Sequence, residues 1–229
     1  PRAAEGAVVR AHLAIIRHDH RGALQELPAA ASIGTDRLLA RSRDLAEGWA
    51  HSNLDQHLQA VAVFEQLVKR EPDDLLGRIG LGNSLLALDR RREAEAQFDE
   101  VLRRDPDNRF ALAERAMIRF VEGDDAGAEV GFRAALAQAP SAYTCPYEGL
   151  GLLYLRQGRL GEAGEHFEKA IEINPEIEYR KYDGLARVRM REGRLDEAET
   201  LLQRSLLNHP GGAEATELLA ELARMRAAP

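Results

Sequence analysis

Histidine and cysteine side chains are the groups in this chain that could bind a metal or act as a nucleophile. His18 and His20 flank Asp19 in an expected turn, but two histidines without a cysteine or a third fixed ligand form a weak zinc pattern. Cys145 has no histidine and aspartate at a spacing typical of nucleophilic catalysis. We therefore predict no metal site, no cofactor and no catalytic residue, and a protein that is not an enzyme.

Two pairs of glycines resemble phosphate-binding loops in composition only. Gly80 and Gly82 are separated by one residue, as are Gly149 and Gly151. A phosphate-binding loop follows a strand and opens a helix, whereas each of these pairs lies inside an expected helix. Their small size instead suits close packing between helices.

The elements that carry these residues repeat along the chain. Five prolines follow one another at intervals of 34, 34, 35 and 35 residues, namely Pro72, Pro106, Pro140, Pro175 and Pro210. Eight residues before them stand Phe64, Phe98, Phe132, Phe167 and Leu202, and twelve before them stand Ala60, Ala94, Ala128, Ala163 and Ala198. Such a period indicates a repeated pair of helices, and each pair must stack on its neighbours to bury its apolar face.

The stretch from Tyr147 to Tyr154, continued by Ala163, Phe167 and Pro175, resembles the signature of the tetratricopeptide repeat (TPR) family. Tyr147 replaces the usual tryptophan. The resemblance implies an all-α TPR superhelix, an α-solenoid of antiparallel helix pairs with a C-terminal capping helix. It also implies a non-enzymatic scaffold that binds a segment of a partner protein in a concave groove.

We predict a single array over residues 1–229. It consists of a degenerate repeat at 1–34, repeats at 35–74, 75–108, 109–142, 144–178 and 179–212, and a capping helix at 213–229. In the capping helix, Leu218, Leu219 and Leu222 are expected to face inward, and Glu214, Glu217, Glu221 and Arg224 outward. A polar outer face of this kind allows an array to end in water.

Small residues are expected where two helices of a pair meet. The alanine before each phenylalanine should face a small residue of the first helix, namely Gly82, Ala116, Gly151 or Ala186. Gly123, Gly158 and Gly193 stand where first helices must end, and a left-handed glycine there satisfies the last carbonyls.

The register of the helix before Ser52 has two readings. Counting back from Pro72 puts Gly48 at the small-residue position, with Asp44 toward the core. Leu38, Leu45 and Trp49 instead form an apolar stripe at helical spacing. We prefer the stripe, which places Trp49 in the core and lengthens the following turn by about three residues. Thr35 or Asp36 is expected to cap this helix.

The composition of the 229-residue chain limits the classes of protein and of partner that we expect. A hydrophobic content of 45% and a charged content of 30% suit a soluble helical protein, and no apolar run approaches a membrane span. A formal net charge of −7 argues against nucleic acid as a partner. The single cysteine excludes an internal disulfide and leaves the compartment open, either cytoplasmic or periplasmic. The predominance of arginine over lysine indicates a bacterial source.

In the TPR family the concave surface comes from the first helix, at the second, fifth, ninth and twelfth places of each repeat. These places hold Leu76, Ile79, Asn83 and Leu86, then Phe110, Ala113, Met117 and Phe120, then Cys145, Glu148, Leu152 and Leu155, then Arg180, Asp183, Arg187 and Met190. The predicted partner-binding residues are Asn83, Phe110, Met117, Leu152, Arg156, Arg180, Arg187 and Arg191. The resemblance thus implies a partner segment with apolar anchors and an acidic flank.

Simpler roles for some of these side chains stay open. Phe120 and Leu155 could be buried under the neighbouring repeat, and Arg187 could pair with Asp183 across one turn of a solvated helix. A clamp for the carboxylate of a chaperone tail is not expected, since only Asn83 matches that pattern.

Two alternatives to a self-contained scaffold also stay open. The chain begins at Pro1, which suggests a processed or truncated terminus, so it could be the TPR portion of a larger secretion, envelope-assembly or transferase protein. It could also self-associate through the ends of the array.

Overall fold

A computed structural model describes residues 2–30, 36–138, 143–175 and 180–227. Within these ranges the chain forms thirteen α-helices, one short 3-10 helix and no strand, which confirms the all-α prediction. Residues 31–35 and 139–142, which include the cap candidate Thr35 and the repeat proline Pro140, lie outside the described residues.

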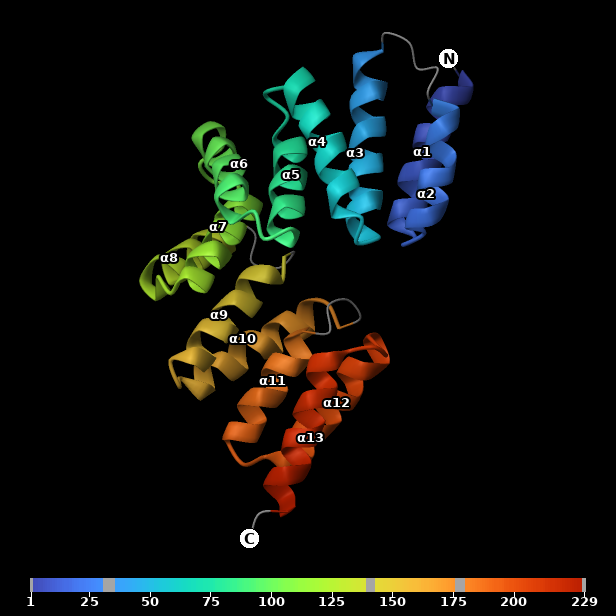
Figure 1. Ribbon diagram of the computed structural model, residues 1–229. Helices are drawn as coiled ribbons and strands as arrows, with labels where there is room; N and C mark the ends of the chain where they lie inside the picture. The colour runs from blue at the N-terminus through green and yellow to red at the C-terminus, as the bar shows by residue number, and fades with distance from the viewer. Residues whose placement is uncertain (1, 31–35, 139–142, 176–179, 228–229) are drawn as a thin grey trace. The chain divides into compact units, whose positions relative to one another are not determined.

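The first compact unit, Pro1–Pro106, contains three helix pairs, blue to green in Figure 1. They are α1 (Arg2–Ile16) with α2 (His20–Glu26), α3 (Arg37–Asn53) with α4 (His57–Arg70), and α5 (Leu75–Ala87) with α6 (Arg91–Arg104), and the 3-10 helix Leu27–Ala30 follows α2. Helix α3 contacts both α1 and α5. The first helices of the pairs therefore form one layer of this unit.

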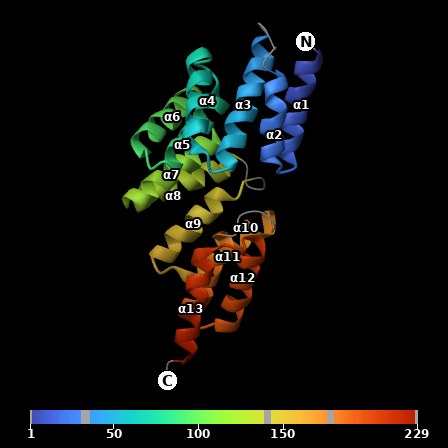
Figure 2. The same cartoon turned by 45° about the vertical axis from the view of Figure 1, so that its right-hand side comes forward.

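The second compact unit, Asp107–Pro229, contains three further pairs and a final helix, yellow-green to red in Figure 2. The pairs are α7 (Arg109–Glu122) with α8 (Asp125–Gln138), α9 (Cys145–Arg156) with α10 (Leu160–Ile173), and α11 (Arg180–Arg191) with α12 (Leu195–Asn208), followed by α13 (Ala213–Ala227). Contacts run from α7 to α9, from α9 to α11 and from α11 to α13. These four helices make a continuous layer.

Side-chain caps fix the starts of several first helices. The carboxylate of Asp36 accepts a hydrogen bond from the backbone N–H of Leu39 at 3.1 Å, so Asp36 is the cap of α3. Asp74 and Asn108 cap α5 and α7 in the same way. Each cap satisfies one of the backbone donors that a helix start leaves unpaired.

The turn inside each pair uses one left-handed residue at the same place. Gly123, Gly158 and Gly193 have φ values of 87°, 76° and 76°, as predicted for the ends of first helices. Asp55 and Asp89 occupy the equivalent places in the first unit with φ values of 58° and 59°. The backbone turn is therefore conserved between units although the residue type differs.

Phenylalanine rings of the second helices lie beside two of the small residues of the first helices. A Cβ atom at Gly82 would meet ring carbons of Phe98 at 2.6 Å, and one at Gly151 would meet those of Phe167 at 2.8 Å. Both rings are buried. The missing side chain at each glycine therefore leaves room for a ring of the second helix. That the alanines of the second helix also face these glycines stays a prediction.

The preferred register of α3 is wrong, and the count back from Pro72 is correct. Gly48 lies against the ring of Phe64, where a Cβ would come within 2.5 Å, whereas Leu38 is 75% exposed and Trp49 is only partly buried. Helix α3 ends at Asn53 and α4 begins at His57, so the turn is as short as the one between α5 and α6.

Ion pairs explain why an acidic residue can occupy the core side of α3. Asp44 is 5% exposed and accepts hydrogen bonds from Arg43 and from Arg70, each at 2.6 Å. A buried carboxylate is tolerated when it is paired and hydrogen-bonded in this way.

Candidate functional site

Partly exposed apolar side chains lie on the first helices of the second unit. Phe110 and Met117 on α7 and Leu152 on α9 are each intermediate in exposure. Met117 and Leu152 pack on the core formed by Leu153, Tyr154 and their neighbours. Ala113, expected beside them, is fully buried and does not reach the surface.

An aromatic contact fixes the start of this apolar row. The rings of Phe110 and Tyr143 meet edge to face with centroids 4.9 Å apart, and the guanidinium of Arg109 lies 4.6 Å from the centroid of Phe110. The Tyr143 hydroxyl donates to Glu114 at 3.1 Å, and burial is the main cause that raises the pKa of Tyr143. Tyr143 is therefore a neutral hydrogen-bond donor and not a base.

The arginines predicted to bind a partner are mostly engaged within the chain. Arg156 donates to the carbonyl of Phe120 at 2.8 Å, pairs with Asp125, and places its guanidinium 3.8 Å from the centre of the Phe120 ring. Arg191 donates to the carbonyl of Leu155 at 2.8 Å. Of the described residues, none pairs with the exposed Arg180. Leu155 is buried, as one reading of the sequence expected.

Arg187 pairs with a residue of the final helix and not with Asp183. Its Nη2 donates to Glu214 at 2.8 Å, and both side chains are about half exposed at 46%. Asp183 is 1% exposed, and neither of its carboxylate oxygens accepts a hydrogen bond within the described part of the chain. Burial raises the pKa of Asp183, and the nearby Ser205 opposes that rise.

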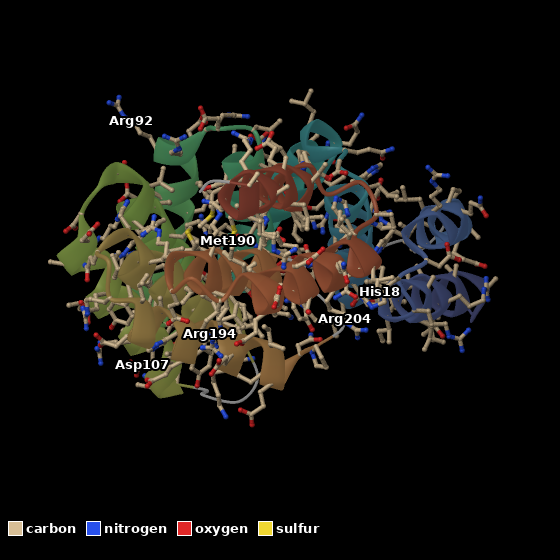
Figure 3. All side chains as sticks on the ribbon, turned by 90° about the horizontal axis from the view of Figure 1, so that it is seen from below. His18, Arg92, Asp107, Met190, Arg194 and Arg204 are labelled. Atoms are coloured by element: carbon tan, nitrogen blue, oxygen red, sulfur yellow. The ribbon has the colours of Figure 1, made fainter. Side chains whose placement is uncertain are left out.

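A cleft of about 230 Å³ opens between α11 and α13. It is lined by Arg187, Met190, Arg191, Glu214, Glu217, Leu218, Glu221 and Met225; Figure 3 labels Met190. Leu218 and Leu222 are buried as predicted. The glutamates expected on the outer side of α13 are exposed as predicted, and they also line this cleft, which the helical pattern of α13 alone did not indicate.

Asn83 belongs to the first unit. It is partly buried on α5, and its side-chain oxygen has no hydrogen-bond partner among the described residues. The predicted partner-binding residues are thus divided, with Asn83 in one unit and the other seven in the other unit.

The side chains that commonly bind metals do not gather into a cluster in the described part of the chain. In these ranges no group of three or more His, Cys, Asp or Glu side chains could hold a metal ion. The rings of His18 and His20 meet edge to face with centroids 6.1 Å apart (His18 is labelled in Figure 3).

None of the described helices combines the length and apolar character needed to span a bilayer.

Two segments of the sequence match a known family model. Residues 54–117 and 154–222 match the model described as "Tetratricopeptide repeat", and together they make up more than half of the chain. No curated protein matches the sequence significantly.

Solved structures share the fold at low identity. A tetratricopeptide repeat protein from Parabacteroides merdae is 15% identical, with a TM-score of 0.69 over 99% of this chain and 88% of that one. PilW, described as a type IV pilus biogenesis factor, is 18% identical, with a TM-score of 0.72 over 96% and 99%. A chain of the APC/C hetero-tetramer Cut9-Hcn1 is 15% identical, with a TM-score of 0.84 over 97% of this chain and 43% of that one. At such identities the likeness concerns the fold alone.

Proposed function

The chain belongs to the tetratricopeptide repeat family, and from this we propose a non-enzymatic scaffold that binds an extended or helical segment of a partner protein. Arrays of this kind use the surface formed by stacked repeats for binding. We place the binding surface on the layer of first helices in the second unit, where α7, α9 and α11 contact one another in succession.

A row of half-buried apolar side chains carries this proposal. Phe110, Met117 and Leu152 come from two neighbouring first helices and keep part of their apolar surface exposed to water. Methionine adapts its shape to irregular apolar surfaces. A partner segment with apolar anchors would remove this surface from water, which is favourable in proportion to the area buried.

Of the predicted arginines, Arg180 is the best placed to bind an acidic flank of the partner, and Arg156, Arg187 and Arg191 are less available. Arg180 is exposed, whereas Arg156, Arg187 and Arg191 already bond to Asp125, Glu214 and the Leu155 carbonyl. A partner carboxylate would have to compete with these contacts. The apolar row is therefore the main determinant that we propose.

The test is the binding of a peptide to the full chain and to Met117→Glu. A segment recovered from a displayed library of random peptides provides the probe, and calorimetry measures its Kd. Met117→Glu places an unpaired charge against the apolar segment and should weaken binding at least about tenfold. Met117→Ala, which removes the anchor without adding charge, should weaken it less.

Val130→Glu is the matched control, because Val130 is 68% exposed on α8, a second helix. Circular dichroism must show that each variant remains helical, since Met117 also contacts the core. If Val130→Glu abolishes binding and Met117→Glu does not, the second helices form the site and the proposal is wrong.

Self-association is a second candidate, favoured by an exposed apolar stripe on α1. Val9, Leu13 and Ile16 are 57%, 44% and 72% exposed and lie on one face of the helix. The outer side of α13 is largely polar, so we propose that two α1 helices meet about a two-fold axis. Light scattering over a concentration series should show dimers that Leu13→Glu converts to monomers; monomers at every concentration would exclude this candidate.

A further inference from the structure

We propose that the cleft between α11 and α13 binds a partner segment that carries a lysine or arginine beside an aliphatic side chain. The inference rests on the proposed scaffold function and specifies the chemistry of the partner at one part of that surface. It differs from the acidic flank expected from the sequence, because three glutamates line the cleft and Arg187 already pairs with one of them, Glu214.

Of the two arginines at this cleft, Arg187 is neutralised by a carboxylate, and Arg191 keeps its charge while it is held by a backbone carbonyl. The Arg187 guanidinium pairs with Glu214 at 2.8 Å, and Arg191 donates to the carbonyl of Leu155 at 2.8 Å. On the opposite wall, Glu217 and Glu221 are exposed, and no described side chain forms an ion pair with either. The α13 wall therefore carries negative charge that a partner cation can complete.

The spacing of these two glutamates suits a single cation. Residues four apart on a helix have Cβ atoms about 6 Å from each other on the same face. One ammonium or guanidinium group placed between Glu217 and Glu221 can therefore contact both carboxylates. A guanidinium can also donate two hydrogen bonds to one carboxylate.

The floor of the cleft is apolar and adaptable. Met190 and Leu218 are 4% and 6% exposed, and Met225 is 39% exposed at one end. The volume of about 230 Å³ lies below the roughly 300–1,000 Å³ of small-molecule sites. It suits one or two side chains of a protein segment, and the aliphatic stem of a lysine or arginine can lie on such a floor.

Asp183 is a buried carboxyl of α11 that is not part of the cleft lining. Asp183 lies one turn before Arg187 and two turns before Met190, so the three side chains project from the same face of α11. Both Asp183 oxygens are buried without a hydrogen-bond partner within the described residues. A cation bound in the cleft would lower the electrostatic cost of this carboxyl.

The experiment selects random dodecapeptides displayed on phage against the immobilised full chain at low ionic strength. The enriched peptides are then titrated by fluorescence anisotropy against the parent and the double variant Glu217→Gln/Glu221→Gln. The control, Glu122→Gln/Glu165→Gln, changes the net charge equally at two exposed glutamates that do not line the cleft.

We expect enriched peptides that contain lysine or arginine next to an aliphatic residue. The cleft double variant should bind them about five- to tenfold more weakly, and the control within about twofold of the parent. Added salt should reduce this difference, because half-exposed ion pairs are screened.

Two results would overturn the inference. Enriched peptides that are acidic or uncharged contradict it, as do basic peptides that bind the cleft double variant as tightly as the parent. If those peptides still lose affinity with Met117→Glu, the scaffold proposal survives and only the cation site fails. If no peptide is enriched, or if neither change matters, the proposed function fails as well.

Discussion

The ring of Phe167 lies directly against Gly151, so closely that a Cβ on the glycine would be 2.8 Å from Cζ of the ring. Phe167 is 1% exposed and belongs to the core of the second unit. Gly82 and Phe98 have the same relationship in the first unit. The absence of a side chain on one helix thus makes room for a ring on the other, and this complementarity positions the layer of first helices.

Gly151→Ala should destabilise the chain. The added methyl group must displace the Phe167 ring, which costs about 1–3 kcal/mol in a packed interior, while the better helix propensity of alanine offsets up to about 1 kcal/mol. Urea unfolding followed by circular dichroism measures the difference. Adding Phe167→Leu to Gly151→Ala should recover part of the loss, because the smaller side chain relieves the overlap.

Gly161→Ala is the matched control in the same helix pair. A Cβ at Gly161 would meet nothing within 4 Å, so only the helix propensity changes. We expect a gain of about 0.5 kcal/mol. Equal effects of the two substitutions would contradict the packing argument.

Asp55→Gly should stabilise the first unit. Asp55 has a φ of 58° and a side chain that is 97% exposed, and glycine occupies the equivalent turn position in the second unit. Glycine adopts this conformation without the strain of a Cβ, although it adds entropy to the unfolded chain. The expected net gain is about 0.5 kcal/mol in thermal or urea unfolding. The reverse change, Gly158→Ala, should cost about 1 kcal/mol, and a stabilising Gly158→Ala would refute this account of the turn.

Asp183→Asn should stabilise the second unit at neutral pH by about 1 kcal/mol, because it removes the charge of a carboxylate that is only 1% exposed. Burial is the main cause that raises the pKa of Asp183 in the folded state. Between the unfolded pKa near 4 and the raised folded pKa, the folded state binds more protons, so the parent loses stability as the pH rises through this window.

The stability difference between Asp183→Asn and the parent should therefore be small below about pH 4 and reach its full size above the folded pKa. Urea unfolding of both proteins over a pH series measures it. A variant that is less stable than the parent at pH 7 would indicate that the Asp183 charge is satisfied in the folded state.

Much of the fold could be predicted because its determinants recur locally. The left-handed turns at Gly123, Gly158 and Gly193 and the buried phenylalanines follow from residue types at a fixed period. The register of α3 could not be predicted from its apolar stripe. Asp44 is held by Arg70, 26 residues away in the sequence, and no helical pattern reveals such a pair.

The pairing of the charged side chains at the candidate site could not be predicted from the sequence either. Asp183 lies four residues before Arg187, a spacing that suggests an ion pair along one helix. In the structure Arg187 instead pairs with Glu214 of α13, the next helix of the same layer. Glu217 and Glu221 fall on the polar side of α13, and only the packing of α13 on α11 shows that this side faces a cleft. Contacts between repeats therefore determine the electrostatics of the surface.

Hydroxyl-radical footprinting can locate a bound partner segment on the first helices of the second unit. Side-chain oxidation of the full chain is measured by mass spectrometry with and without a selected peptide. We expect the peptide to protect Phe110, Met117 and Leu152 and to leave the exposed Val130 on α8 and Leu207 on α12 unchanged. Protection of Val130 or Leu207 with unchanged oxidation of Met117 would contradict this expectation.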